Sequence, residues 1–322
     1  MTLMKLIAPD YYGSFRCKAS ECRHSCCVGW EIGIDSETLV KYRNLTGTLG
    51  DKIRQNISIS EEGCFFRLDE NERCPFLTDE GLCEIIASAG NALLCDICAE
   101  HPRFYNEYSD RTEAGIGLCC EEAAEIIIMN RQPVSLIVLE DDGNNAALSP
   151  AEQDFFTKRD AIISVIQNRI LPISKRFENV MNLTGIPDEI FSSGSCVNYF
   201  AETEKLNDDR DIFLSNISGF GKSVHPGIDT ISGEAEQLAA YFLYRHLAGA
   251  LDDGRFRERT AFALLSVYMI TCAFLCSDTR TSDNLCSIAR IYSADIEYSD
   301  ENIGRILDML QLNITAYDAE KR

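Results

Sequence analysis

Four cysteines stand close together near the start of the chain, in the order Cys17-x4-Cys22-x3-Cys26-Cys27. Thiolates three or four residues apart can converge within one turn of chain, and zinc ions and iron–sulfur clusters both take four such soft ligands. Further cysteines follow before residue 121, at Cys64, Cys74, Cys83, Cys95, Cys98, Cys119 and Cys120. A single cysteine packs well in a protein core, but a set this dense predicts metal binding.

The ligand types favour an iron–sulfur cluster over zinc. Zinc sites built of cysteine usually carry two C-x2-C knuckles, and this chain has that spacing only at Cys95-Asp-Ile-Cys98. Histidine is scarce, with four residues in the whole chain. A radical-type C-x3-C-x2-C motif would start at Cys22 and Cys26, but its third position is Gly29, which argues against that class of enzyme. Near-complete cysteine ligation therefore predicts a cluster, with zinc as the alternative occupant.

The charge of the chain limits its partners. The 322 residues include 30 basic and 51 acidic side chains, which gives a formal net charge of −21. Such a charge repels phosphate backbones and anionic lipids, so we expect no binding to nucleic acid or to a membrane. It attracts basic surfaces, such as a protein that presents lysines. No pattern in the sequence indicates an oligomeric state.

The use of cysteine indicates a reducing compartment. Eleven of the 15 cysteines precede residue 121, and the odd total disfavours a complete disulfide framework. The first residues, MTLMKLIAPDYYG, lack the apolar core of a signal peptide. We therefore expect a cytoplasmic protein whose thiols are available to bind metal.

The surrounding sequence predicts the elements that must position these cysteines. Apolar periodicity is poor through residues 1–130 and glycines interrupt the chain, so we expect an irregular, cysteine-rich metal-binding module there. Helical spacing dominates residues 131–322, which predicts an all-α body on which the module packs. The expected fold is therefore mainly α.

Caps and apolar spacing locate several helices of this body. Ser149-Pro150-Ala151-Glu152 has the pattern of a capped helix start, and phenylalanines and isoleucines then recur at helical spacing until Pro172. The segment from Glu234 to Leu251 is a second amphipathic helix, and Ser299-Asp300-Glu301 begins another. The apolar run from Ala261 to Cys276 has 16 residues, whereas a membrane span needs roughly 20. That run therefore predicts a buried core helix.

The cysteine motifs together resemble the flagellin lysine-N-methylase family, which is related to zinc- or iron-chelating domains with the pattern CxxCxxCC. The motifs occur in one order between residues 15 and 124. The matching stretches are Phe15-Arg16-Cys17, Cys26-Cys27-Val28-Gly29-Trp30, Ile34-Asp35, Cys74-Pro75-Phe76-Leu77, Gly81-Leu82-Cys83, Cys98-x2-His101-Pro102-Arg103, Leu118 to Ala124 and, less distinctively, Tyr241-Phe242-Leu243-Tyr244-Arg245-His246.

This resemblance implies a methyltransferase that uses S-adenosylmethionine, carries a 4Fe–4S cluster and methylates lysines of flagellin or another lysine-bearing protein. Matched residue by residue, the metal-binding cysteines of the family correspond to Cys17, Cys22, Cys26, Cys27, Cys74, Cys83, Cys98 and Cys120. One cluster needs four ligands, so either two metal sites exist or some of these thiols support the fold. No motif identifies the catalytic residues.

Three charged residues beside the motifs are further candidates. The guanidinium of Arg103 is suited to grip the carboxylate of the methyl donor in a bidentate manner, and the alternative is a salt bridge inside the module. The carboxylates of Asp35 and Glu122 could receive the ammonium group of a substrate lysine. We expect both to cap helices instead.

Two other functions fit the same cysteines. One is a non-enzymatic zinc- or iron-binding module that docks a protein partner. The other is an electron-transfer oxidoreductase, which would need an acceptor site that the sequence does not reveal. Binding of S-adenosylmethionine distinguishes the methyltransferase from both.

Overall fold

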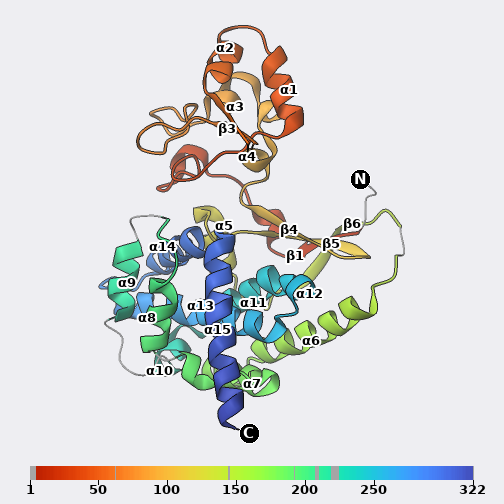
Figure 1. The fold of residues 1–322 in the computed structure, drawn as a ribbon, viewed down its shortest axis with the longest axis vertical. Helices are drawn as coiled ribbons and strands as arrows, with labels where there is room; N and C mark the ends of the chain where they lie inside the picture. The colour runs from red at the N-terminus through yellow and green to blue at the C-terminus, as the bar shows by residue number, and fades with distance from the viewer. Residues whose placement is uncertain are drawn as a thin grey trace. The chain divides into compact units, whose positions relative to one another are not determined.

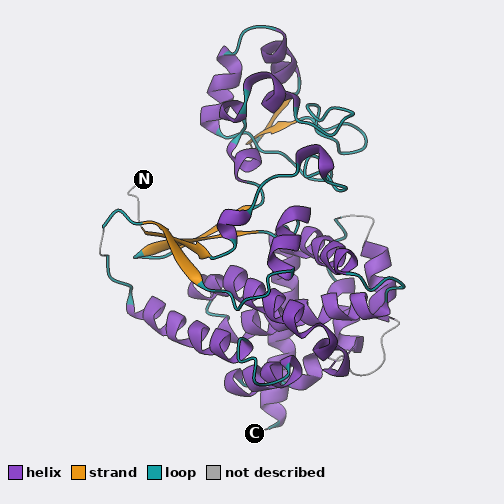
Figure 2. Cartoon of the chain, turned by 180° about the vertical axis from the view of Figure 1, so that it is seen from behind, coloured by secondary structure: helices purple, strands orange, loops and turns teal. Residues whose placement is uncertain are grey.

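The computed structural model describes residues 5–61, 63–143, 146–191, 193–206, 210–218 and 225–321. The chain divides into two compact units, which are visible in Figures 1 and 2. The helical unit contains Met1–Phe15, Phe104–Cys119 and Ala123–Arg322, and the cysteine unit contains Arg16–Arg103 and Cys120–Glu122. The chain thus begins in the helical unit, leaves it and returns to it.

This division differs from the expected boundary between residues 130 and 131. Strand β1 (Lys5–Pro9) lies within the sheet of the helical unit, so the N-terminus belongs there. The short segment Cys120–Glu122 joins the cysteine unit, where Glu122 pairs with Lys18 at 3.0 Å. Contacts between residues that are far apart in the sequence determine the boundaries of the two units, and the composition along the chain does not reveal such contacts.

The helical unit also contains a four-stranded sheet with the order β4-β5-β1-β6, so the prediction of an all-α body is wrong. The other strands are β4 (Arg103–Glu107), β5 (Arg111–Ile116) and β6 (Leu136–Glu140). Strand β1 pairs in parallel with β5 and antiparallel with β6. Each strand has five or six residues, which is too short for its alternation to stand out from loop sequence.

The rest of the helical unit is mostly helix, which confirms a mainly helical protein (Figure 2). The helices are α5 (Glu121–Ile128), α6 (Pro150–Ile166), α7 (Ile173–Thr184), α8 (Ser193–Ala201), α9 (Arg210–Ser218), α10 (His225–Ile228), α11 (Ser232–His246), α12 (Ala250–Asp253), α13 (Phe256–Cys276), α14 (Ser282–Tyr292) and α15 (Asp300–Glu320). A π-helical turn, Ser293–Glu297, joins α14 to the segment before α15.

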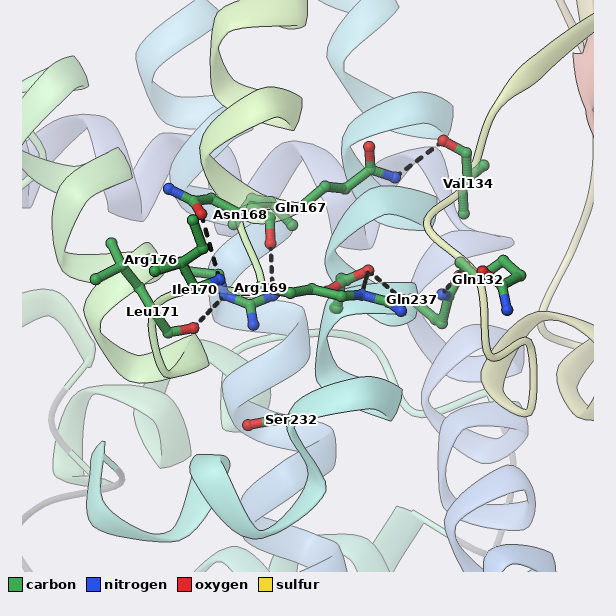
Figure 3. Close-up of polar contacts among 12 residues, drawn as sticks. Gln132, Val134, Gln167, Asn168, Arg169, Ile170, Leu171, Arg176, Ser232 and Gln237 are labelled. Carbon is green, nitrogen blue, oxygen red and sulfur yellow. Dashed lines mark hydrogen bonds and ion pairs between the residues drawn. The ribbon is translucent and has the colours of Figure 1, made fainter.

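Capping patterns in the sequence predict where helices begin more accurately than apolar spacing predicts where they end. Ser149 and Glu152 form the expected capping box of α6, and Ser299 is the N-cap of α15, as its position in the sequence predicts. Helix α6 ends at Ile166, however, and Pro172 is the N-cap of α7, so the residues between them form a connection (Figure 3). Apolar spacing suggested one helix up to Pro172 because Ile170 fits the pattern, but its side chain is 92% exposed.

Helix α13 is the central core helix that the sequence predicts. Its residues are buried without interruption from Thr260 to Phe274. It is the one helix, within the part of the chain that the structure describes, whose length and hydropathy would suffice to cross a membrane. Most of it is buried inside the helical unit, so the prediction of a buried helix is confirmed. Helix α11 packs against it and ends at His246, earlier than the expected Leu251.

A buried ion pair ties the sheet to the helices. Arg159 on α6 donates two hydrogen bonds to Glu113 on β5, at 2.6 and 3.0 Å, and neither side chain is more than 2% exposed. The guanidinium also lies over the ring of Phe156, 4.6 Å from its centroid. Bidentate pairing and this ring contact compensate the loss of water around the two charges.

The cysteine unit has more regular structure than the sequence predicts. It contains α1 (Ser36–Asn44), α2 (Thr48–Gln55), α3 (Glu84–Ala89), α4 (Asp96–Glu100) and a hairpin of β2 (Ile57–Ser60) and β3 (Gly63–Phe66). These elements surround a core of their own, where the rings of Phe66 and Phe76 lie 4.9 Å apart. Periodicity missed these elements because they are too short to establish a repeat.

Candidate functional site

Six cysteines lie in or against the core of the cysteine unit, and five of them are close enough to affect one another's ionisation; we call these five the inner thiol group. Cys74 and Cys95 are buried in this core, and the partly buried Cys27, Cys83 and Cys98 pack against it. Backbone contacts hold the segments together. The amide of Cys74 donates to the carbonyl of Cys27 at 2.9 Å, and Cys83 forms a β-bridge with Leu77. Cys95 precedes α4, and the amide of Cys98 donates to its carbonyl at 3.0 Å.

Four other cysteines form an outer thiol group, which consists of Cys17, Cys22, Cys26 and Cys120. Two of its members, Cys17 and Cys26, are exposed. Polar contacts bring the Cys120 segment to the start of the unit, because the amide of Arg23 donates to the carboxylate of Glu121 at 3.1 Å. These thiols lie close enough to influence one another's ionisation. Burial, followed by the nearby Cys120, raises the pKa of Cys22 to about 11.

The Cys26-Cys27 dipeptide connects the two groups. Cys26 lies among the outer thiols, whereas Cys27 packs on the inner core. The Cys26 thiol donates a hydrogen bond to the Cys27 sulfur, which lowers the pKa of Cys27 to about 7, with Ser25 and the Arg73 guanidinium acting in the same direction. Two adjacent cysteines can thus serve two different thiol groups.

The eight matched cysteines divide equally between the two groups. The structure brings Cys17, Cys22, Cys26 and Cys120 together in one group and Cys27, Cys74, Cys83 and Cys98 in the other. Sequence matching did not select Cys95, although its C-x2-C spacing with Cys98 was the available signal. Cys64, which is also outside the matched set, lies on β3 against the same core.

The predicted metal site itself is not confirmed. Among the described residues, no three histidine, cysteine, aspartate or glutamate side chains are arranged to hold one metal ion. Two pairs of these thiols make hydrogen bonds to each other, Cys26 with Cys27 and Cys95 with Cys98.

The three charged residues beside the cysteine motifs lie at or near the start of a helix or strand. Asp35 is the N-cap of α1 and accepts a hydrogen bond from the amide of Thr38 at 2.8 Å, so the expected capping role is confirmed. Glu122 lies in the first turn of α5 and pairs with Lys18. Arg103 begins β4 and is partly buried. Its contact with a methyl donor stays a prediction.

A cluster of buried polar side chains in the helical unit was not found from the sequence. Glu297 accepts hydrogen bonds from the hydroxyl of Tyr241 at 2.8 Å and from the ring of His246 at 2.6 Å. Arg245 lies 3.3 Å from the same carboxylate and also donates to Tyr241. The Tyr241 hydroxyl in turn accepts from the amide of Leu118. The only sequence signal for this cluster was the stretch from Tyr241 to His246, which resembles the flagellin lysine-N-methylase family.

This polar cluster keeps a carboxylate ionised inside the protein. Burial raises the pKa of Glu297, but Arg245 and the hydrogen bond from His246 outweigh burial and lower the pKa to about 2. Burial also lowers the pKa of His246 despite the neighbouring carboxylate, so the imidazole stays neutral near pH 7. The result is one negative charge held by donors from α11, a combination suited to fix the helix against the π-helical turn.

Comparison with known proteins identifies the chain as a relative of lysine methylases, and the resemblance to the flagellin lysine-N-methylase family is confirmed. Proteins named lysine-N-methylase from Salmonella typhimurium and Salmonella choleraesuis are each 28% identical over 154 residues. This alignment covers 45% of the present chain and 38% of each relative, so it spans well under half of those proteins.

A second kind of relative has a flagellar name. The flagellar biosynthetic protein FliU of Salmonella muenchen is 26% identical over 134 residues, which is 40% of this chain and 79% of the relative. No family model and no solved structure matches the chain.

Proposed function

We propose that this chain is an S-adenosylmethionine-dependent lysine N-methyltransferase that acts on flagellin. The similarity to proteins named lysine-N-methylase carries this proposal, and the flagellar name of another relative supports the substrate. The net charge of −21 gives a physical reason for encounter with a basic patch, because opposite charges speed association.

We further propose that the inner thiol group holds a 4Fe–4S cluster. The inner thiol group is suited to hold such a cluster because its side chains are cysteine thiols, which are the ligands that iron–sulfur clusters use. Cys27, Cys74, Cys83 and Cys98 would bind the iron atoms, with Cys95 as the neighbouring thiol. The surrounding core, which includes two phenylalanine rings, would shield them from solvent and oxygen. A bound cluster would supply a redox-active centre.

Methyl transfer also sets requirements on the residues of this chain. The substrate lysine must lose its proton before its nitrogen can attack the methyl group, and water must be excluded from the reacting atoms. S-adenosylmethionine supplies the methyl group as a sulfonium when bound. Arg103 would orient this donor through its carboxylate, since a guanidinium binds planar anions with two parallel hydrogen bonds.

Calorimetric titration of S-adenosylmethionine into the anaerobically purified chain tests this proposal. We expect saturable binding of one molecule per chain, measured together with cluster occupancy from visible absorption. The Arg103→Gln variant should bind the donor at least about tenfold more weakly, because a charge-assisted contact is lost. Arg43→Gln, at an exposed position on α1, is the matched control and should bind normally. Absence of any binding heat with a cluster-replete preparation would refute the proposal.

A further inference from the structure

Two thiols of the inner thiol group, Cys95 and Cys98, lie on one turn of the chain and contact each other. The thiol of Cys98 donates a hydrogen bond to the sulfur of Cys95. The amide of Cys98 also donates to the carbonyl of Cys95 at 3.0 Å, which closes the turn between the two residues. The backbone and the side chains therefore hold these two sulfurs side by side.

The backbone of this turn has the spacing that a disulfide needs. The first and fourth residues of a turn have Cα atoms less than about 7 Å apart, and disulfides usually join Cα atoms that are roughly 4.4–6.8 Å apart. Cys95 is the N-cap of α4, with an extended backbone at φ −69° and ψ 156°, and Cys98 lies in the first turn of that helix. A bond between the two sulfurs can therefore form without rearrangement of α4.

The other hydrogen-bonded pair of thiols, Cys26 with Cys27, is less suited to such a bond. These residues are adjacent, so a disulfide between them would close a ring through a single peptide bond. That ring forces the peptide away from its planar trans form, which is costly. The two residues between Cys95 and Cys98 remove this constraint, so the pair on α4 is the one that can be oxidised without strain.

The two sulfurs on α4 differ in their access to solvent. Cys95 is 1% exposed in the core of the cysteine unit, whereas Cys98 is only partly buried. A small oxidant can therefore reach Cys98 first, and Cys95 can react only with a sulfur that already lies beside it. The pair thus combines an accessible attacking thiol with an internal resolving thiol, which are the two parts of a redox-active dithiol.

We propose that Cys95 and Cys98 form a reversible disulfide by exchange with a small-molecule disulfide such as oxidised glutathione. The Cys98 thiol loses its proton, and its sulfur attacks the glutathione disulfide to give a mixed disulfide and one glutathione thiol. The Cys95 sulfur then attacks Cys98, loses its own proton and releases the second glutathione as a thiol. Two protein thiols are oxidised and one glutathione disulfide is reduced to two thiols, so electrons and protons balance.

The consequence of this disulfide for metal binding rests on the proposed cluster. Cys98 is one of the proposed iron ligands, and a sulfur bound in a disulfide has no thiolate to offer to iron. Oxidation of the cluster-free chain therefore withdraws one ligand from the inner thiol group, and reduction returns it. Cys95, which lies outside the matched cysteines, controls in this way when Cys98 is available.

Peptide mapping of the cluster-free full chain tests the disulfide itself. The chain is treated anaerobically with excess oxidised glutathione, the remaining thiols are alkylated, and the products are identified by mass spectrometry. We expect a disulfide between Cys95 and Cys98 in most chains, and its loss after treatment with dithiothreitol. Cys95→Ser should instead retain glutathione on Cys98, because the resolving thiol is missing. Cys64→Ser, the matched control in the same unit, should form the disulfide normally.

The same treatment of cluster-replete protein tests the link to metal binding. We expect the disulfide to form at least about tenfold more slowly there, because a thiolate bound to iron is not free to attack. The disulfide is overturned if Cys95 and Cys98 both remain open to alkylation, if either pairs with another cysteine, or if Cys95→Ser keeps no glutathione on Cys98. Equal rates with and without the cluster would refute ligation by Cys98, and the regulation with it, but not the disulfide.

Discussion

Replacing Cys27 or Cys98 by serine is expected to remove nearly all iron from anaerobically purified protein. Both thiols belong to the inner group, where the proposed cluster has four cysteine ligands. A serine hydroxyl stays protonated and is a poor ligand for iron, so three thiolates would have to hold the cluster. Metal binding can contribute about 10 kcal/mol or more to folding in small zinc domains, so the cysteine unit should also lose stability. Iron and sulfide per chain and visible absorption measure the effect.

Two variants distinguish this assignment from a general effect of losing a thiol. Cys17→Ser alters an exposed member of the outer group, and Cys64→Ser alters a cysteine on β3 of the same unit. Both should keep the iron content of the natural chain. If Cys17→Ser loses iron while Cys27→Ser and Cys98→Ser retain it, the cluster belongs to the outer group and our assignment is wrong.

Replacing Glu297 by glutamine is expected to reduce the stability of the helical unit by about 3 kcal/mol near neutral pH, with the loss disappearing in acid. The pKa of Glu297 is about 2 in the folded protein against an ordinary value of 4.5. A lowered pKa means that ionised Glu297 stabilises the fold fully above about pH 5, and that this contribution is lost as the pH falls towards about 2. Denaturant unfolding measured between about pH 7 and pH 2 gives the free energy of unfolding directly.

Glu301→Gln is the matched control for this prediction. Glu301 is also paired with an arginine, Arg305, but its side chain is 60% exposed. Such surface pairs contribute about 0.3–0.5 kcal/mol, so this variant should change stability little. The importance of the polar cluster would be contradicted if both variants lost the same free energy, or if the acid dependence of Glu297→Gln paralleled that of the natural chain.

Local patterns in the sequence predicted individual helices well. The capping box at Ser149 and the cap at Ser299 lie where expected, and the apolar run ending at Cys276 is a buried helix. These features depend on residues within one or two turns of each other. Short strands such as β1 escaped prediction because their stability comes from pairing with β5 and β6, which lie far away in the sequence.

The candidate sites depend on contacts between distant segments, so sequence reasoning identified only their components. The cysteines were predicted as a set, but their separation into two groups depends on the folding of the Cys120 segment back to the first cysteines. The polar cluster needs α11 and the π-helical turn together.

Methyl transfer to flagellin is the measurement that tests the proposed function most directly. Anaerobically purified, cluster-replete protein is incubated with S-adenosylmethionine and flagellin at low and high salt, and lysine methylation is measured by mass spectrometry. We predict added methyl groups on flagellin lysines, with slower modification at high salt because screening weakens the attraction of the acidic chain for basic patches. Unmodified flagellin under these conditions would contradict a lysine methyltransferase acting on this substrate.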